Sequence, residues 1–298
     1  MSERDNPSMK YQNAINFRQA LETRLTQFSK ENGVDLQWLR KQVAFDRLLA
    51  RVFFKVREPR WLLKGGYAME LRFSRLARAT KDMDLSLPFM PPEAKAEDAL
   101  RSIRDEIQDL AQRDLSDWFV YEIQSPIKEL DAAPYGGARF PVNVKLAQRK
   151  FTNFNLDIGV GDVVIFEPEW REDHNFLKFA EILSVKIPLL PREQQFAEKI
   201  HTYTLPREGS LNSRTRDLVD MVLLIEQGAL DTTKLNKAVE ATFKRRNTHS
   251  VPIDLLPPPE NWSRTYEDLA RDCGVGLKTI AEAFALVESY WKKIFERK

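Results

Sequence analysis

The chain has 298 residues, of which 30% are charged and 43% are hydrophobic, and its net charge is only +2. This composition is typical of a globular protein with a sizeable core, and it excludes a polycation that would bind nucleic acid through bulk charge alone. The single cysteine, Cys273, excludes an internal disulfide and favours a reducing compartment. No apolar stretch approaches the roughly 20 residues that span a bilayer, and the polar N-terminus lacks a signal-peptide core, so we expect a cytoplasmic protein with no membrane partner.

The first third of the chain alternates between helical and extended patterns. Apolar residues recur at helical spacing near the N-terminus, and Asp35 is a suitable cap for a second helix. In chain order the pattern predicts helices within 14–58, a strand at 61–63, a glycine turn at 65–66, a helix at 67–73, a strand at 82–87 and a helix that begins near the prolines at 91–92 and extends to about 114.

The middle of the chain is predicted to be a sheet and the remainder helical. In RFPVNVKLAQ, which begins at Arg139, alternate residues are apolar, so one face of this strand is expected to be buried. The predicted strands are 118–124, 139–148, 155–160 and 163–167, and the predicted helices are 192–204, 213–228, 235–246, 264–273 and 277–295. Residues 189–190, between two prolines, are interpreted as a connector. The pattern therefore favours a mixed or antiparallel sheet within 60–190, followed by helices.

One short region combines two features that suit phosphate chemistry. Asp82 and Asp84 are two apart on a predicted strand, so both carboxylates point to one side and could hold Mg²⁺. Asp157 lies in another predicted strand and would complete a two-metal site if the two strands are neighbours. Gly65 and Gly66 precede a helix, where backbone amides can approach a phosphate closely, and Lys64 or Arg72 could add charge.

Each feature alone also has a plainer interpretation. Two aspartates on a strand are often a solvated face, and paired glycines are often only a turn. Their order on a strand, turn, helix and strand favours a site for a nucleoside triphosphate and its metal ions. The three histidines, at 174, 201 and 249, are scattered without metal-ligand spacing, so structural or surface roles are expected for them.

Five segments together, LKGGYAMELR, RATKDMDLSL, LDIGVGD, AEKIH and SRTRDLVDM, resemble the AbiEii/AbiGii nucleotidyltransferase toxins of the DNA polymerase β-like superfamily. The resemblance extends over about 35–227. It implies an α+β, bilobed protein with a nucleotidyltransferase core at 1–190 and a helical lobe at 191–298. It also implies a Mg²⁺-dependent enzyme that transfers nucleotides from a triphosphate to RNA, with the tRNA 3′ end as the acceptor in related toxins, and a cognate antitoxin as partner.

The resemblance assigns roles residue by residue. Gly65 and Gly66 match the superfamily's Gly-Ser motif, although Gly66 offers no hydroxyl to a phosphate. Asp82 and Asp84 match its metal-binding aspartates. Thr80 falls where some relatives carry a hydroxyl that a kinase-like antitoxin can phosphorylate.

Two residues of the helical part also match the family. Lys199 matches the lysine expected to contact the triphosphate, although most helical lysines are solvated. Asp217 matches the acidic residue that follows, which could orient Lys199 or a substrate hydroxyl. Its plainer role is a surface pair with Arg214 or Arg216. Asp220, three residues on, is interpreted as structural.

The leading hypothesis is in-line attack of an RNA 3′-hydroxyl on the α-phosphate, with pyrophosphate leaving and the RNA docked between the lobes, where basic residues gather. Two alternatives stay open. One is transfer of the nucleotide to a hydroxyl of a partner protein, and the other is a catalytically silent binder of nucleotide or RNA. The sequence does not specify the preferred nucleotide, the acceptor or the oligomeric state.

Overall fold

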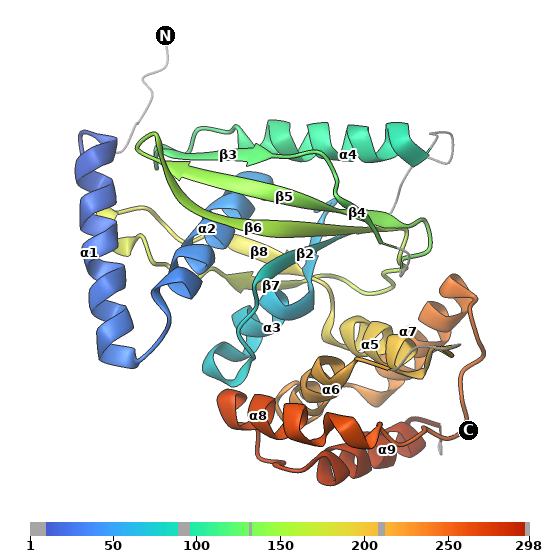
Figure 1. Ribbon diagram of the computed structural model, residues 1–298. Helices are drawn as coiled ribbons and strands as arrows, with labels where there is room; N and C mark the ends of the chain where they lie inside the picture. The colour runs from blue at the N-terminus through green and yellow to red at the C-terminus, as the bar shows by residue number, and fades with distance from the viewer. Residues whose placement is uncertain (1–9, 89–95, 131–132, 208–211, 296–298) are drawn as a thin grey trace.

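The protein, as seen in a computed structural model, has an eight-stranded mixed sheet and two groups of helices (Figure 1). The structure describes residues 10–88, 96–130, 133–207 and 212–295. The elements are α1 (Ala14–Asn32), α2 (Leu36–Val52), β1 (Leu62–Lys64), α3 (Gly65–Phe73), β2 (Asp82–Leu87), α4 (Ala96–Ala111), β3 (Phe119–Ile123), β4 (Lys128–Glu129), β5 (Gly137–Leu146), β6 (Arg149–Val160), β7 (Glu169–Glu172), β8 (Lys186–Leu189), α5 (Arg192–Thr204), α6 (Thr215–Gln227), α7 (Thr232–Arg246), α8 (Ser263–Cys273) and α9 (Ile280–Phe295).

The sheet combines parallel and antiparallel pairs, as the sequence predicts. Its strand order is β3-β5-β6-β2-β1-β8-β7, and β4 pairs with Ala138 and Arg139 at the start of β5, outside the residues that pair with β3. The β2–β6 and β1–β8 pairs are parallel, whereas the remaining pairs are antiparallel. Strand β2, which carries Asp82 and Asp84, lies between two other strands, β6 and β1.

Alternation along β5 separates a buried face of the sheet from a polar one. The side chains of Phe140, Val142, Val144 and Leu146 are fully buried, as predicted. On this face α2 packs against β6, and α4 packs against β3 and β5 (Figure 1). The opposite face presents the intervening polar residues of β5 and β6 and the two aspartates of β2.

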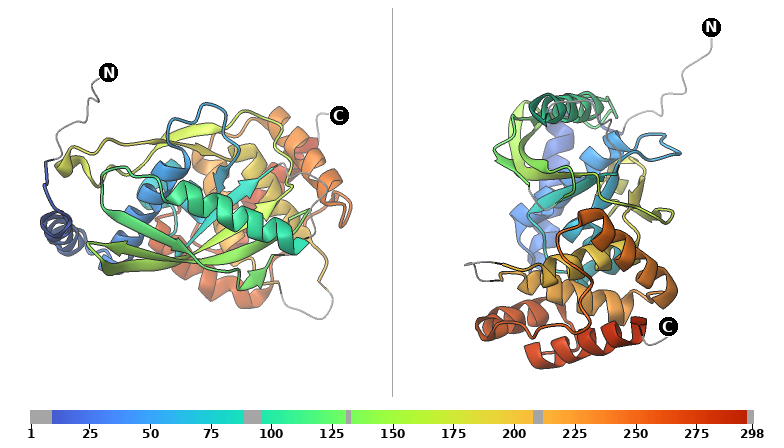
Figure 2. Two further views of the ribbon diagram at one scale, coloured as in Figure 1. Left: turned by 90° about the horizontal axis from the view of Figure 1, so that it is seen from above. Right: turned by 90° about the vertical axis from the view of Figure 1, so that its right-hand side faces the viewer.

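The C-terminal helices form a second hydrophobic cluster beside the sheet. Its buried members come from α5 to α9 and the segments that connect them, together with Met69 of α3 and Ala77. The neighbouring residues Tyr67 and Ala68 of α3 belong to the cluster under the sheet, so α3 is packed between the two clusters. Figure 2 shows the sheet with α1, α2 and α4 on one side of α3 and helices α5 to α9 on the other. The domain boundary at 190/191 stays a prediction.

A buried ion-pair cluster joins α2 to the segment that enters β3. Asp117 is fully buried, with Arg47 Nε 2.6 Å and Arg51 Nη1 2.9 Å from its Oδ2. Both arginines lie four apart on α2, so they share one face of that helix. Asp117 also accepts a hydrogen bond from the Phe119 amide. The cluster fixes α2, and therefore the buried side of the sheet, relative to β3.

Two predictions about the middle of the chain are wrong. Residues 163–167 form no strand, and the strand begins instead at Glu169. Ile165 is exposed, so the apolar residues of this segment are not buried against the sheet. The expected connector at 189–190 begins within the sheet, since Leu189 is the last residue of β8 and pairs with Leu63. Leu190 lies outside the strand, although its amide still donates to the Leu63 carbonyl.

The predicted start of the fourth helix, at the prolines of 91–92, lies outside the described residues. Within the described residues, none of the helices has both the length and the apolar character needed to cross a bilayer.

We expect Asp117→Ala to lower the free energy of unfolding by about 3–5 kcal/mol, because it leaves two buried guanidinium groups without their carboxylate. Glu122→Ala is the matched control, since it removes the carboxylate of a half-exposed pair with Lys145 and should cost no more than about 1 kcal/mol. Urea unfolding of both variants measures the difference. Equal losses would show that the buried cluster contributes no more than the surface pair.

Candidate active site

Three carboxylates meet on the polar face of the sheet. Strand β2 runs parallel to β6 with Asp84 opposite Asp157 and Asp82 opposite Asn155. The two strands are therefore neighbours, and Asp157 lies beside the aspartates of β2. The proposed place of Asp157 in a two-metal site depended on this arrangement. The Asn155 amide donates a hydrogen bond to Asp82 Oδ1 at 3.0 Å.

Gly65 leaves the space that the Asp84 carboxylate occupies. Strand β1 pairs with β2 so that Lys64 lies opposite Asp84, and α3 begins at the next residue. A β-carbon on Gly65 would lie 2.0 Å from Asp84 Oδ2, and its φ of +67° also favours glycine. Gly66 is similarly close to Thr80, whose Oγ1 would be 2.8 Å from an added β-carbon. Both glycines thus permit close packing, and their contact with a phosphate stays a prediction.

Asp84 is the one of these three carboxylates whose negative charge has no hydrogen-bond or ion-pair partner among the described residues. Burial raises the pKa of Asp84, and the charge of Asp157 raises it further, to about 6. The cations Lys64, Arg78 and Lys199 act in the opposite direction. A half-buried carboxylate without a partner is suited to accept a cation.

Asp157 differs from Asp84 because it already has a cation. Arg139 Nε and Nη2 donate to the two carboxylate oxygens of Asp157 at 2.8 and 2.7 Å. The same Nη2 lies 3.7 Å from Asp82 Oδ2. The Asp157 hydrogen bond is the largest of the effects that raise the pKa of Arg139.

The donor set fits a metal bound through two carboxylates. Asp82 and Asp84 share one side of β2, and Asp84 has both oxygens available for a cation. In the described part of the chain, no three carboxylate, imidazole or thiol groups converge in a geometry for a metal ion. Mg²⁺ in nucleotide enzymes commonly uses one or two carboxylates and takes its other ligands from phosphates and water.

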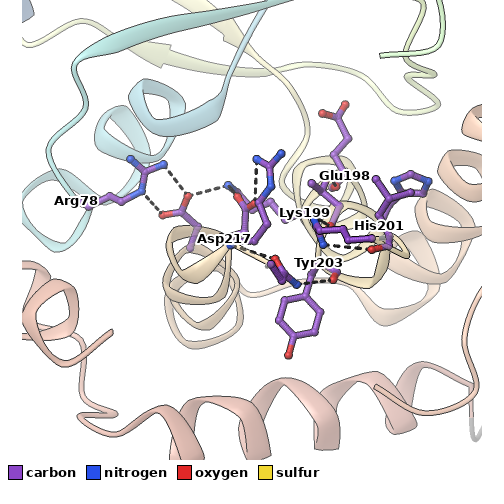
Figure 3. A network of polar contacts seen from close by, with 12 residues as sticks. Arg78, Glu198, Lys199, His201, Tyr203 and Asp217 are labelled. Carbon is purple, nitrogen blue, oxygen red and sulfur yellow. Dashed lines mark hydrogen bonds and ion pairs between the residues drawn. The ribbon is translucent and has the colours of Figure 1, made fainter. Parts of the chain in front are cut away.

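Lys199 and Asp217, which the sequence paired, are in contact. Lys199 Nζ lies 2.9 Å from Asp217 Oδ1 and 2.7 Å from Asp220 Oδ2 (Figure 3). Helices α5 and α6 pack side by side and supply the two partners. Burial lowers the pKa of Lys199, but the two carboxylates raise it by more, so it lies above its ordinary value. Arg214 is also near Asp217, at 3.8 Å, and is half-exposed.

Arg78 extends this network toward the carboxylates of the sheet. Its Nε and Nη2 both lie 3.2 Å from the Asp220 carboxylate (Figure 3). Asp220 is therefore shared between Arg78 and Lys199, which agrees with the structural role expected for it. Burial lowers the pKa of Arg78, but its ion pair with Asp220 raises it by more, so the pKa lies above its ordinary value.

A second network ties β1 to the helices. Lys64 Nζ lies 2.9 Å from both Asp162 and Glu198. Arg246 of α7 lies 2.8 Å from Asp162 and 3.5 Å from Glu198. All four side chains are largely buried, so Lys64 is committed to this network between the sheet, α5 and α7. His201, next to it, has a pKa lowered to about 3, mainly by burial and then by Arg246.

Arg72, predicted to contribute to phosphate binding, is buried within the protein. Its Nε lies 3.0 Å from Glu169 Oε2, and its other nitrogens contact Gln195 and the Leu190 carbonyl. These contacts hold β7 and the start of α5 against α3. They favour a structural role, so we leave Arg72 out of the proposed site.

Thr80 and Glu70 form a buried pair beside the glycines. The Glu70 Oε1 atom accepts a hydrogen bond from the Thr80 amide, and the Thr80 hydroxyl donates to the Asp82 carbonyl. The other oxygen, Glu70 Oε2, is buried without a hydrogen-bond partner. Burial, which the Thr80 hydrogen bond only partly offsets, raises the pKa of Glu70 to about 8.

Sequence reasoning assigned no role to Arg139 or Arg78. Alternation along β5 places Arg139 on the polar face, but the hairpin register that brings it to Asp157 is a long-range property. Arg78 is the first residue of the RATKDMDLSL segment, but its contact with Asp220 of α6 cannot be read from the sequence. His201 and His249 are far apart in sequence but lie together, since their ring centroids are 4.8 Å apart and Thr248 Oγ1 contacts both rings at 2.9 and 3.0 Å. These contacts are compatible with the structural or surface roles expected for them.

Comparison with known proteins gives a family and a fold. The family model described as nucleotidyl transferase AbiEii toxin, type IV TA system, matches residues 47–294. The solved structure of MenT4, a nucleotidyltransferase toxin from Mycobacterium tuberculosis H37Rv, is similar with a TM-score of 0.58 at 16% identity over 92% of this chain and 88% of that one.

A second solved structure, the GLD-2/RNP-8 complex, aligns with a TM-score of only 0.29 at 13% identity, over 89% of this chain and 73% of that one, and it supports no argument. No curated protein matches the chain.

We expect Gly65→Ala to destabilise the protein more than Gly33→Ala. Both residues have nearly the same φ, +67° and +66°, but nothing lies within 4 Å of a β-carbon at Gly33. Each substitution should cost about 1–2 kcal/mol for the left-handed backbone. Gly65→Ala should cost about 1–3 kcal/mol more, because Asp84 must move. Urea unfolding distinguishes the two, and equal losses would contradict the close packing of Asp84 on Gly65.

We expect Glu70→Gln to remove a pH dependence of stability. Because the folded protein raises the pKa of Glu70 from 4.5 to about 8, this carboxyl group contributes stability that is complete below pH 4.5 and is lost as pH rises through 8. The variant should therefore match the wild type near pH 4.5 and exceed it at pH 9 by a few kcal/mol. Urea unfolding at both pH values tests this, with the exposed Glu267→Gln on α8 as control. A constant difference across pH would refute it.

Proposed function

Because the chain belongs to the AbiEii family of nucleotidyltransferase toxins of type IV toxin–antitoxin systems, we propose that it transfers a nucleotide from a nucleoside triphosphate to the 3′ end of an RNA, namely tRNA, and thereby blocks translation. The family gives a nucleotide as substrate and an antitoxin as partner. The RNA acceptor, the cytoplasm as the place of action and the use of Mg²⁺ are our proposals.

The observation that carries this proposal is the Asp84 carboxylate. It is half-buried next to Asp82 and Asp157, it packs on the glycine that opens α3, and it has no partner among the described residues. Such an arrangement destabilises the free protein unless it serves a bound cation.

Asp82 and Asp84 would hold Mg²⁺, whose chemistry when bound is to offset the charge of the triphosphate. The RNA 3′-hydroxyl attacks the α-phosphorus, a new P–O bond forms, and the bond to pyrophosphate breaks. The hydroxyl proton passes to a carboxylate of the Asp82–Asp84 pair.

Lys199 is the cation we assign to the triphosphate. It is fixed by Asp217 and Asp220 rather than being free in solvent, which positions its charge before the substrate binds. Asp217 is accordingly a positioning residue for Lys199. Arg78 adds a second positive charge, which Asp220 fixes in the same way.

The acceptor RNA docks, in this proposal, where α6 begins. Among the basic residues of α5, Lys199 is buried and Arg192 is bound to Glu169. Arg214 and Arg216 are exposed at the start of α6, close to Asp217. They are therefore better placed than the buried cations to contact RNA phosphates.

We expect the wild-type protein, incubated with Mg²⁺, total tRNA and each labelled triphosphate in turn, to label tRNA. Asp82→Ala should reduce labelling at least about 100-fold, because loss of a metal-binding carboxylate removes several kcal/mol of charge stabilisation. Asp109→Ala, an exposed acid on α4 at the opposite face of the sheet, is the matched control and should label normally.

Gel electrophoresis separates the possible results. Label in a protein band would show that the acceptor is a protein hydroxyl and not RNA. No label with any triphosphate, from protein shown to be folded by circular dichroism, would contradict nucleotide transfer to tRNA.

A further inference from the structure

We propose that Arg139 holds Asp157 in the free protein, so that a divalent metal ion binds the Asp82–Asp84 pair tightly only together with the nucleoside triphosphate. This inference rests on the proposed function and adds an order of assembly to it. Arg139 belongs to none of the motifs that identify the family, and its role follows from its contacts alone.

The first step is that Arg139 uses both oxygens of Asp157. Its Nε and Nη2 donate to separate carboxylate oxygens at 2.8 and 2.7 Å, which is the two-pronged geometry that makes Arg–carboxylate pairs strong. Arg139 lies directly opposite Asp157 in the antiparallel β5–β6 register. The backbone therefore presents the guanidinium to this carboxylate without requiring any loop to move.

The second step is that the metal site is one carboxylate short. Asp84 lies opposite Asp157 on the other side of β6, so a cation at Asp84 is next to a carboxylate that is already bound. It can gain Asp157 as a ligand only by displacing two charge-assisted hydrogen bonds. Two carboxylates alone hold Mg²⁺ or Mn²⁺ weakly, and the missing ligands must come from elsewhere.

The third step concerns charge. Arg139 Nη2 lies only 3.7 Å from Asp82 Oδ2, so its positive charge also faces the carboxylate pair. This charge opposes a free divalent cation, whereas a triphosphate brings about four negative charges and oxygen ligands of its own. Metal and nucleotide are thus expected to bind as a unit, and the free protein to bind the metal poorly.

The experiment is an electron paramagnetic resonance titration of the full chain with Mn²⁺, with and without the four α,β-methylene nucleoside triphosphates. The wild type should bind Mn²⁺ weakly alone and at least about tenfold more tightly with the analogues. Arg139→Gln should bind Mn²⁺ without nucleotide about tenfold more tightly than the wild type, since it frees a third carboxylate ligand.

Three further variants make the result specific. Arg40→Gln is the matched control, because Arg40 also forms a two-pronged pair, with Glu22, between α1 and α2, and it should leave Mn²⁺ binding unchanged. Asp157→Asn added to Arg139→Gln should abolish the gain in Mn²⁺ affinity that Arg139→Gln gives without nucleotide. Arg139→Lys keeps the charge but loses the fork geometry, and it should give an intermediate gain even if Arg139→Gln does not fold.

The outcomes separate this inference from the function on which it rests. If the analogues recruit Mn²⁺ but neither Arg139 variant binds it more tightly alone, the role of Arg139 is wrong and the metal site stands. Tight Mn²⁺ binding by the wild type without nucleotide also overturns the inference. If no protein binds Mn²⁺ even with the analogues, the proposed metal site fails and the inference fails with it.

Discussion

The crowding of negative charge at Asp84 and Asp157 is the constraint on which the rest of the site depends. Neighbouring parallel strands hold these carboxylates at the same level, and like charges so placed require compensation. Positive charge that compensates these carboxylates comes from Lys64 on β1, Arg139 on β5 and Lys199 on α5. The buried cations in turn require acids of their own, which the loop after β6 and helices α5 and α6 supply. Ion pairs that compensate one strand pair therefore join the sheet to the helices, in addition to the apolar packing on either side of α3.

The sequence was sufficient for features with a local cause. The strand at 82–87 alternates clearly, and the structure has the same bounds. Helix α5 begins and ends where its composition changes. The contact between Lys199 and Asp217 also agrees with the interpretation that one orients the other, because both lie on strongly patterned helices that pack together.

The features that the sequence did not reveal depend on contacts between distant segments. The short strand β8 forms because it pairs with β1, and β7 forms because it pairs with β8. Pro188 within β8 lowers the strand propensity of that segment, so its sequence does not predict a strand. Arg139 meets Asp157 only through the β5–β6 register. Buried arginines such as Arg51 contradict the usual preference of this residue for solvent, so only the position of Asp117 explains them.

The burial of Thr80 has a consequence for how this site could be regulated. Its side chain is only 6% exposed, it packs on Gly66, and its amide and hydroxyl are both bonded within the protein. An enzyme that transfers a group to this hydroxyl cannot reach it while the segment before β2 is closed. Modification would then proceed at a rate set by the local opening equilibrium of that segment. A bound substrate that holds the segment closed would protect Thr80 in proportion to its occupancy.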